Sequence, residues 1–113
     1  MESQLAYYDE TGKDRDDFDK ELPKEMASYT SFRKEVYKDG ALSHKTKRLI
    51  ALALGLQSGC TRCIIGQTRD AIEAGATKVE VLEAASVAVV MGGTQVSAET
   101  WRVVKVLKEL GKW

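Results

Sequence analysis

Residues 58–75, SGCTRCIIGQTRDAIEAG, hold both cysteines of the chain, and the interpretation of the fold starts from them. Cys60 and Cys63 are three positions apart, a spacing that places two side chains on one face of a helix. The apolar residues after the pair and the glycine at position 75 are typical of a helix that ends at a left-handed cap. We therefore expect both sulfurs in the first helical turn, where they can form a reversible disulfide and free backbone N–H groups favour a thiolate.

A redox-active dithiol competes with three other interpretations of this pair. The cysteines can be small core residues, because cysteine is among the most often buried types. A structural zinc site needs four ligands, whereas the chain offers two cysteines and one distant histidine, His44. A permanent disulfide across so short a loop constrains the unfolded chain little. The spacing at a helix start favours redox chemistry, and no metal site is expected.

The composition of the 113 residues predicts a single soluble domain in the cytoplasm. The chain has 17 basic and 17 acidic residues, and this balance argues against nucleic-acid binding. No apolar run approaches the roughly 20 residues that cross a bilayer, and no leader pattern is present. No GxGxxG or Walker motif indicates a nucleotide, so no cofactor is expected. In the cytoplasm, paired cysteines are more often catalytic or metal-bound than structural.

The first 20 residues differ from the rest and are interpreted as an N-terminal arm, followed by a helical domain over residues 21–113. Charged residues dominate the arm, and runs of this kind are usually solvated. Two adjacent tyrosines, Tyr7 and Tyr8, offer the alternative that the arm is anchored on a neighbouring subunit.

Helical periodicity recurs through the domain. Pro23 suits the first position of a helix that Asp39-Gly40 ends. Ser43 is expected to cap the next helix, in which residues 49–56 are apolar on all sides and need cover from a bundle or a subunit.

Two more helices are expected after the cysteine helix. Thr77 and Glu80 have the spacing of a capping box, and Gly92-Gly93 breaks the apolar helix that follows. A strand over residues 79–90 is the main alternative there, because valine is frequent. A last helix from about residue 97 is expected to place its apolar stripe at Trp101, Val104, Leu107 and Leu110.

Residues 45–93, KTKRLIALALGLQSGCTRCIIGQTRDAIEAGATKVEVLEAASVAVVMGG, resemble the core of the carboxymuconolactone decarboxylase superfamily. The resemblance is to its alkylhydroperoxidase-D-like (AhpD-like) branch, which has the CxxC, and it extends over about residues 21–110. It implies an all-α bundle of about five to six helices that assembles as a trimer or hexamer. It also implies antioxidant peroxidase activity (peroxiredoxin activity), with electrons from a dithiol reductant such as a lipoyl or thioredoxin-like protein. Cys63 is then the thiol that reacts with peroxide, and Cys60 the more exposed thiol that resolves it.

The chain departs from this branch at the residues that move protons. A glutamate usually lies twelve positions before the first cysteine and a histidine four positions after the second, whereas this chain has Arg48 and Gln67 there. Arg62 stands where some members have histidine. A guanidinium or an amide cannot take a proton from a thiol near neutral pH. The family's general-base activation is therefore not available in this form.

We hypothesise that charge replaces the base. In this hypothesis Arg48 projects toward the dithiol and favours the thiolate, and Gln67 donates a hydrogen bond to the sulfur or to a bound peroxide. Such a site exchanges disulfides well but protonates a peroxide leaving group poorly. The alternative for Arg48 is a solvated residue or an ion pair between subunits. His44 is interpreted as a surface residue among lysines, with a catalytic role at a subunit interface as the alternative.

Three classes of function follow. The first is a thiol-dependent peroxidase and thiol-disulfide oxidoreductase, which the CxxC and the family core favour. The second is lactone decarboxylation, in which the cysteines are incidental. The third is a non-catalytic oligomeric module that senses redox state, which the absent proton-relay residues favour.

Overall fold

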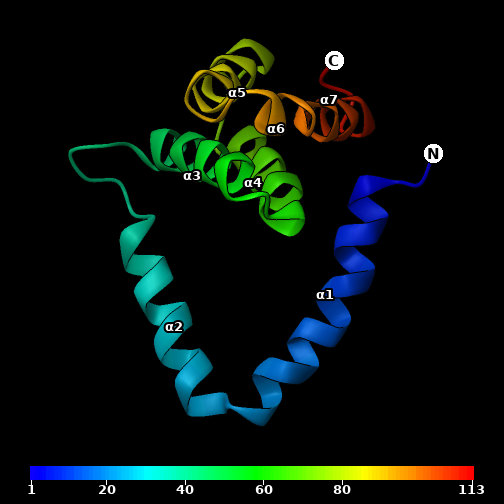
Figure 1. Cartoon of the computed structure of the whole chain (residues 1–113). Helices are drawn as coiled ribbons and strands as arrows, with labels where there is room; N and C mark the ends of the chain where they lie inside the picture. Colours follow the sequence, from blue (N-terminus) through cyan, green and yellow to red (C-terminus); the bar gives the residue numbers. More distant parts are fainter.

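The computed structural model describes all 113 residues and is entirely helical, as predicted, with no strand. The pair α3 and α4 lies at the centre, α5 to α7 cover one side of it, and α1 and α2 form a V on the other side (Figure 1). No helix is both long enough and apolar enough to span a membrane. The helices are α1 (Gln4–Glu21), α2 (Pro23–Val36), α3 (His44–Ser58), α4 (Thr61–Glu73), α5 (Lys78–Gly92), the single turn α6 (Thr94–Ser97) and α7 (Thr100–Glu109).

The core lies between α3, α4, α5 and α7. Each of these helices contributes at least one side chain that is fully removed from solvent, and burial of that kind is the main term that stabilises a helical bundle. The largest of these side chains are Leu52, Leu56, Ile64, Ile65, Val81, Val103, Val106 and Leu107.

Local capping signals set the starts of α3 and α5, as predicted. The Ser43 side chain accepts the N–H of Thr46 at the start of α3. Thr77 and Glu80 form the complete capping box that opens α5, which excludes the strand over residues 79–90. Hydrogen bonds of this kind satisfy backbone donors that a helix start otherwise leaves free.

The apolar stripe of the last helix differs from the prediction. Val103, Val106 and Leu107 are buried, whereas Trp101 is 38% exposed. The predicted stripe contains Trp101, Val104 and Leu107, and the observed stripe contains Val103, Val106 and Leu107. Both have helical spacing and share Leu107, so the sequence alone does not decide which one is buried. The turn α6 precedes α7, and α7 packs with its buried valines toward α4 and α5.

The segment interpreted as an arm forms the helix α1, whose first half packs on α7 and α4. The carboxylate of Glu109 in α7 accepts the backbone N–H groups of Gln4 at 2.8 Å and Leu5 at 3.2 Å, and the Ser3 hydroxyl. By contrast, α2 buries no side chain within its own chain. The V therefore has one limb docked on the bundle and one limb free.

Candidate functional site

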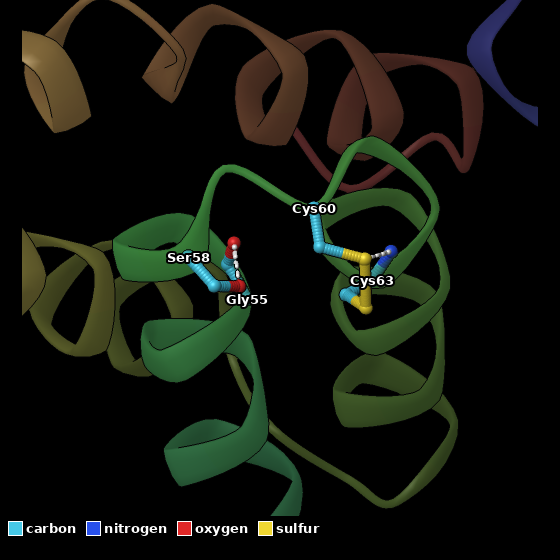
Figure 2. Close-up of a disulfide and its surroundings, with 4 residues drawn as sticks. All are labelled: Gly55, Ser58, Cys60 and Cys63. Carbon is cyan, nitrogen blue, oxygen red and sulfur yellow. Dashed lines mark hydrogen bonds between the residues drawn. A yellow bond between two sulfur atoms is a disulfide. The ribbon is translucent and has the colours of Figure 1, made fainter.

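The two cysteines are joined as a disulfide at the start of α4 (Figure 2). Their Cα atoms are 5.2 Å apart, within the range that a disulfide bridges without backbone movement. Cys60 is the N-cap of α4, and its sulfur accepts the backbone N–H of Cys63 at 3.2 Å. The predicted spacing on one turn is therefore confirmed, and a sulfur atom takes the place that a serine or aspartate oxygen usually has at a helix start.

The exposure of the two cysteines is the reverse of the predicted order. Cys63 is exposed, and Cys60 is half-buried. Cys60 occupies the cap position, so its side chain folds back over the first turn, whereas Cys63 is directed outward from the third helical position. In this chain Cys63 is the sulfur that a substrate in solution reaches more easily.

A glycine of α3 lets the two central helices approach each other at the dithiol. A Cβ atom at Gly55 would lie only 2.9 Å from the Cβ of Cys63, so no larger residue fits without movement. The Gly55 carbonyl accepts the Ser58 hydroxyl at 3.2 Å, beside the disulfide (Figure 2). Close packing here holds the cysteine turn against the end of α3.

A cavity of about 740 Å³ opens beside the disulfide, and residues of α1, α2, α3 and α4 line it. Both cysteines face this cavity, as does Gln67. The rest of the lining is rich in tyrosine and arginine and includes Tyr8, Arg15, Tyr29, Arg33, Tyr37, Arg62 and Asp70.

Arg48 lies behind this lining and not in it, so it does not project toward the sulfurs. Its Nη1 donates to Gln67 Oε1 at 3.1 Å and to Asp70 Oδ2 at 3.3 Å, and its guanidinium lies 3.7 Å from the centre of the Tyr37 ring. The side chain is only 16% exposed, which makes it neither a solvated surface residue nor free for a partner subunit. The interaction with Gln67 occupies the amide oxygen and leaves the amide NH₂ as the group that Gln67 can offer to the cavity.

Asp70 is a site residue that the sequence analysis missed. It lies one turn after Gln67 and also contacts Arg69 at 3.4 Å. Burial lowers the pKa of Arg69, but the charges of Asp70, Tyr8 and Glu73 and the hydrogen bond to Asp70 together raise it by more, so the pKa lies above the ordinary arginine value. Asp70 therefore forms ion pairs with both Arg48 and Arg69. It lies seven positions after Cys63, a spacing that places two side chains on the same face of a helix and could have predicted its place in the site.

Arg62 joins the dithiol helix to α1. Its Nη1 donates to the Tyr8 carbonyl at 2.7 Å and to the Thr11 hydroxyl, and its guanidinium stacks on the Tyr8 ring at 4.1 Å. The same ring packs against Gly66. The guanidinium carbon of Arg69 lies 4.6 Å from the centre of this ring. Tyr8 is thus anchored on α4 of its own chain.

His44 does not join the site. Its Nδ1 lies 2.6 Å from the Tyr37 carbonyl, and its backbone N–H donates to Asp39 at 2.6 Å. It is the first residue of α3, about 20 Å of helix rise from the cysteine turn. Its contacts are those of a residue that holds the loop before α3, and no group of three His, Cys, Asp or Glu side chains is placed to bind a metal.

Comparison with known sequences gives a consistent picture. The sequence profile of the carboxymuconolactone decarboxylase family matches residues 23–106. An uncharacterised protein encoded in the cox locus of Paracoccus denitrificans is 35% identical over 83 residues, which are 74% of this chain and 75% of that protein. An uncharacterised protein of Cupriavidus necator is 34% identical over 71 residues, and the match spans 63% of each chain.

Comparison of structures extends the likeness to α1. An apo structure of a carboxymuconolactone decarboxylase family protein from Legionella pneumophila has a TM-score of 0.90 at 30% identity and covers 98% of this chain and all of that one. A family protein from Thermotoga maritima, for which involvement in an antioxidative response has been suggested, has a TM-score of 0.72 at 31% identity and covers 77% of this chain and 90% of its own.

Proposed function

The chain belongs to the carboxymuconolactone decarboxylase family, and on that premise we propose that it is a thiol-dependent peroxidase and thiol-disulfide oxidoreductase of the AhpD-like type. The observation that carries the proposal is the Cys60–Cys63 pair at the start of α4, facing an open cavity. A dithiol on a helix N-terminus is suited to cycle between thiolate and disulfide. We propose that this chemistry serves an antioxidant role in the cytoplasm.

In the peroxidase reaction the reduced Cys63 thiolate attacks a peroxide oxygen, the O–O bond breaks, and the alkoxide that leaves takes a proton from water to become an alcohol. Cys60 then attacks the resulting sulfenic acid, the disulfide forms, and water leaves. The net reaction oxidises two thiols and reduces one peroxide. A dithiol reductant, such as a lipoyl or thioredoxin-like protein, returns the two electrons. The exposure of Cys63 supports its role as the attacking thiol.

A disulfide exchanger that does not turn over peroxide is the second candidate. It is favoured by the groups around the dithiol, because Gln67 is not basic and Asp70 already interacts with Arg48 and Arg69. A peroxide leaving group needs a proton as the O–O bond breaks, whereas a thiolate leaving group does not. We therefore expect disulfide exchange to be faster than peroxide reduction.

We further propose that the chain acts as a homo-oligomer, a trimer or hexamer by analogy with the branch it resembles. Apolar side chains stay exposed on five helices of the isolated chain (α1, α2, α3, α5 and α7), among them Phe32 at 65%, Val90 at 83% and Met91 at 78%. Exposed large apolar side chains are typical of a face that another subunit covers when they gather on one surface, and this supports the proposal.

Stopped-flow kinetics tests the function. The reduced protein is mixed with a slight excess of peroxide while tryptophan fluorescence and free thiols are followed, with Cys63→Ser and Cys60→Ser beside it. Three results together support the peroxidase: loss of both thiols in the wild type, an intact Cys60 thiol in Cys63→Ser, and loss of the single Cys63 thiol in Cys60→Ser, where the sulfenic acid is not resolved. Intact thiols with peroxide but rapid oxidation by a small disulfide support the exchanger. Thiols that react with neither oxidant would rule out both candidates.

A further inference from the structure

The cavity beside the disulfide carries an excess of positive charge. Arg15 from α1, Arg33 from α2 and Arg62 from α4 line it, and none of the three forms an ion pair. The one carboxylate in the lining, Asp70, is already paired with two other arginines. The acidic side chains of α1 lie outside the lining. The cavity therefore presents three uncompensated cations next to the sulfurs.

Two of these cations are held in place by aromatic surfaces. The Arg33 guanidinium lies 5.8 Å from the centre of the Tyr29 ring and 5.9 Å from that of Tyr37. Arg62 is fixed by the Tyr8 ring and by hydrogen bonds that use its Nη1, which leaves its other N–H groups free. Guanidinium groups that are positioned in advance bind a carboxylate through paired hydrogen bonds at little cost in side-chain entropy.

We propose that the cavity selects a low-molecular-weight thiol or disulfide that carries a carboxylate, with the carboxylate on Arg33 and Arg15 and the sulfur at Cys63. This inference rests on the thiol-disulfide exchange proposed above. The cavity volume of about 740 Å³ is that of a small-molecule site, which is usually about 300–1,000 Å³. The exposed Cys63 lines the same cavity as the arginines, and this shared lining is the observation that the proposal rests on.

The reaction balances with two equivalents of thiol. The first thiolate attacks Cys63 Sγ, the bond to Cys60 breaks, and the electron pair stays on Cys60 Sγ, where the Cys63 N–H and the helix N-terminus stabilise it. The second thiolate attacks the substrate sulfur of the mixed disulfide and releases Cys63. The protein disulfide gains two electrons, the two substrate thiols become a disulfide, and both cysteines take protons from water.

Three small thiols that differ in charge test the selectivity. The oxidised protein in its native assembly is reduced by 3-mercaptopropionate, 2-mercaptoethanol or cysteamine in quenched flow, and each rate is divided by the thiolate concentration. The rate with anionic 3-mercaptopropionate is divided by the rate with cationic cysteamine. This ratio is compared with the ratio of the same two rates for 2-hydroxyethyl disulfide, an uncharged disulfide without a protein site. We expect the protein's ratio to be about tenfold higher, and to decrease with added salt.

Charge-removing variants locate the effect. Arg33→Gln and Arg15→Gln should each lower the ratio about threefold, whereas Lys34→Gln, which removes the same charge from α2 outside the cavity, should not. A ratio equal to that of the free disulfide, or one that all three variants change alike, would overturn the inference. Reduction by 2-mercaptoethanol reports the proposed exchange independently of charge.

A thioether probe, which has no thiol and cannot undergo disulfide exchange, tests binding to the cavity even if no thiol reduces the protein. 3-(Methylthio)propionate should shift the NMR signals of the cavity residues in the wild type and less in Arg33→Gln, and 3-(methylthio)propylamine should not shift them. Equal shifts with both probes, or none with either, would exclude an anion-selective cavity.

Discussion

At the scale of single residues, the contact between Gly66 and Tyr8 brings α1 to the dithiol helix. Gly66 is buried one turn after Cys63, and a Cβ there would lie 2.8 Å from the Tyr8 ring and 2.9 Å from its hydroxyl. Glycine inside a helix costs about 1 kcal/mol relative to alanine. Close packing against Tyr8 therefore requires glycine at position 66, although glycine lowers the stability of the helix itself.

We expect Gly66→Ala to lower the free energy of unfolding by about 1–3 kcal/mol, because Tyr8 must move. In a Tyr8→Ala background the same substitution should raise it by up to about 1 kcal/mol, because alanine then favours the helix without a clash. Urea denaturation followed by tryptophan fluorescence measures both values. Gly12→Ala is the matched control, since a Cβ there meets only the Arg62 side chain, at 3.6 Å, and should not destabilise. Equal losses at Gly66 in both backgrounds would show that Tyr8 is not the obstacle.

At the scale of elements, α7 holds the start of α1 through one carboxylate. Burial raises the pKa of Glu109, but hydrogen bonds from Ser3, Gln4 and Leu5 and the charge of Lys105 lower it by more, so the pKa lies below the ordinary glutamate value. A carboxylate at a helix N-terminus also meets the positive end of the helix dipole. The ends of the chain are thereby joined by a contact that depends on ionised Glu109.

This contact predicts a dependence of stability on pH. Because the folded pKa of Glu109 is depressed, its contribution is complete above the unfolded value of about 4.3 and is lost as the pH decreases through the folded value. The thermal midpoint of the wild type should therefore decrease more steeply below about pH 4.3 than that of Glu109→Gln. Glu83→Gln, at an exposed position of α5, should keep the steepness of the wild type. Identical profiles for the wild type and Glu109→Gln would contradict the assignment.

At the scale of the whole molecule, the free limb of the V is the feature without a partner in its own chain. The helix α2 extends away from the bundle and contacts little besides α1 (Figure 1). It exposes Phe32 and Val36, which are four positions apart on one face. Helices in water gain most of their stability by burying an apolar face. We therefore expect α2 to pack on a second copy of the chain.

Sedimentation equilibrium tests this expectation. The wild type should have the mass of an oligomer, and Phe32→Glu should weaken association by roughly tenfold or more, because it places a charge on the face to be buried. Ser31→Glu introduces the same charge about 100° around α2 from Phe32, on the side away from Val36, and should leave the mass unchanged. Far-ultraviolet circular dichroism should be the same for all three proteins. A monomeric wild type, or equal effects of the two variants, would exclude this face as the interface.

The amino-acid order was sufficient for the features that depend on neighbours along the chain. The capping residues Ser43 and Thr77, the glycine breaks and the CxxC spacing predicted most of the helices and the pairing of the cysteines, because hydrogen bonds within one turn decide them. Gln67 was singled out by the resemblance and not by these local rules, and it lines the cavity together with the cysteines.

Contacts between helices decided the rest. Arg48 forms an ion pair with Asp70 and therefore does not contact the sulfurs. Cys60 is the N-cap of α4, and Cys63 is the more exposed of the two cysteines. The charged first segment docks as a helix, with the Tyr8 ring packed closely over Gly66 of α4. The sequence of the segment itself does not contain this contact, because the partner residue lies on another helix. Which of two apolar stripes of α7 is buried was likewise set by the faces of α4 and α5, since a helix alone presents both equally to water.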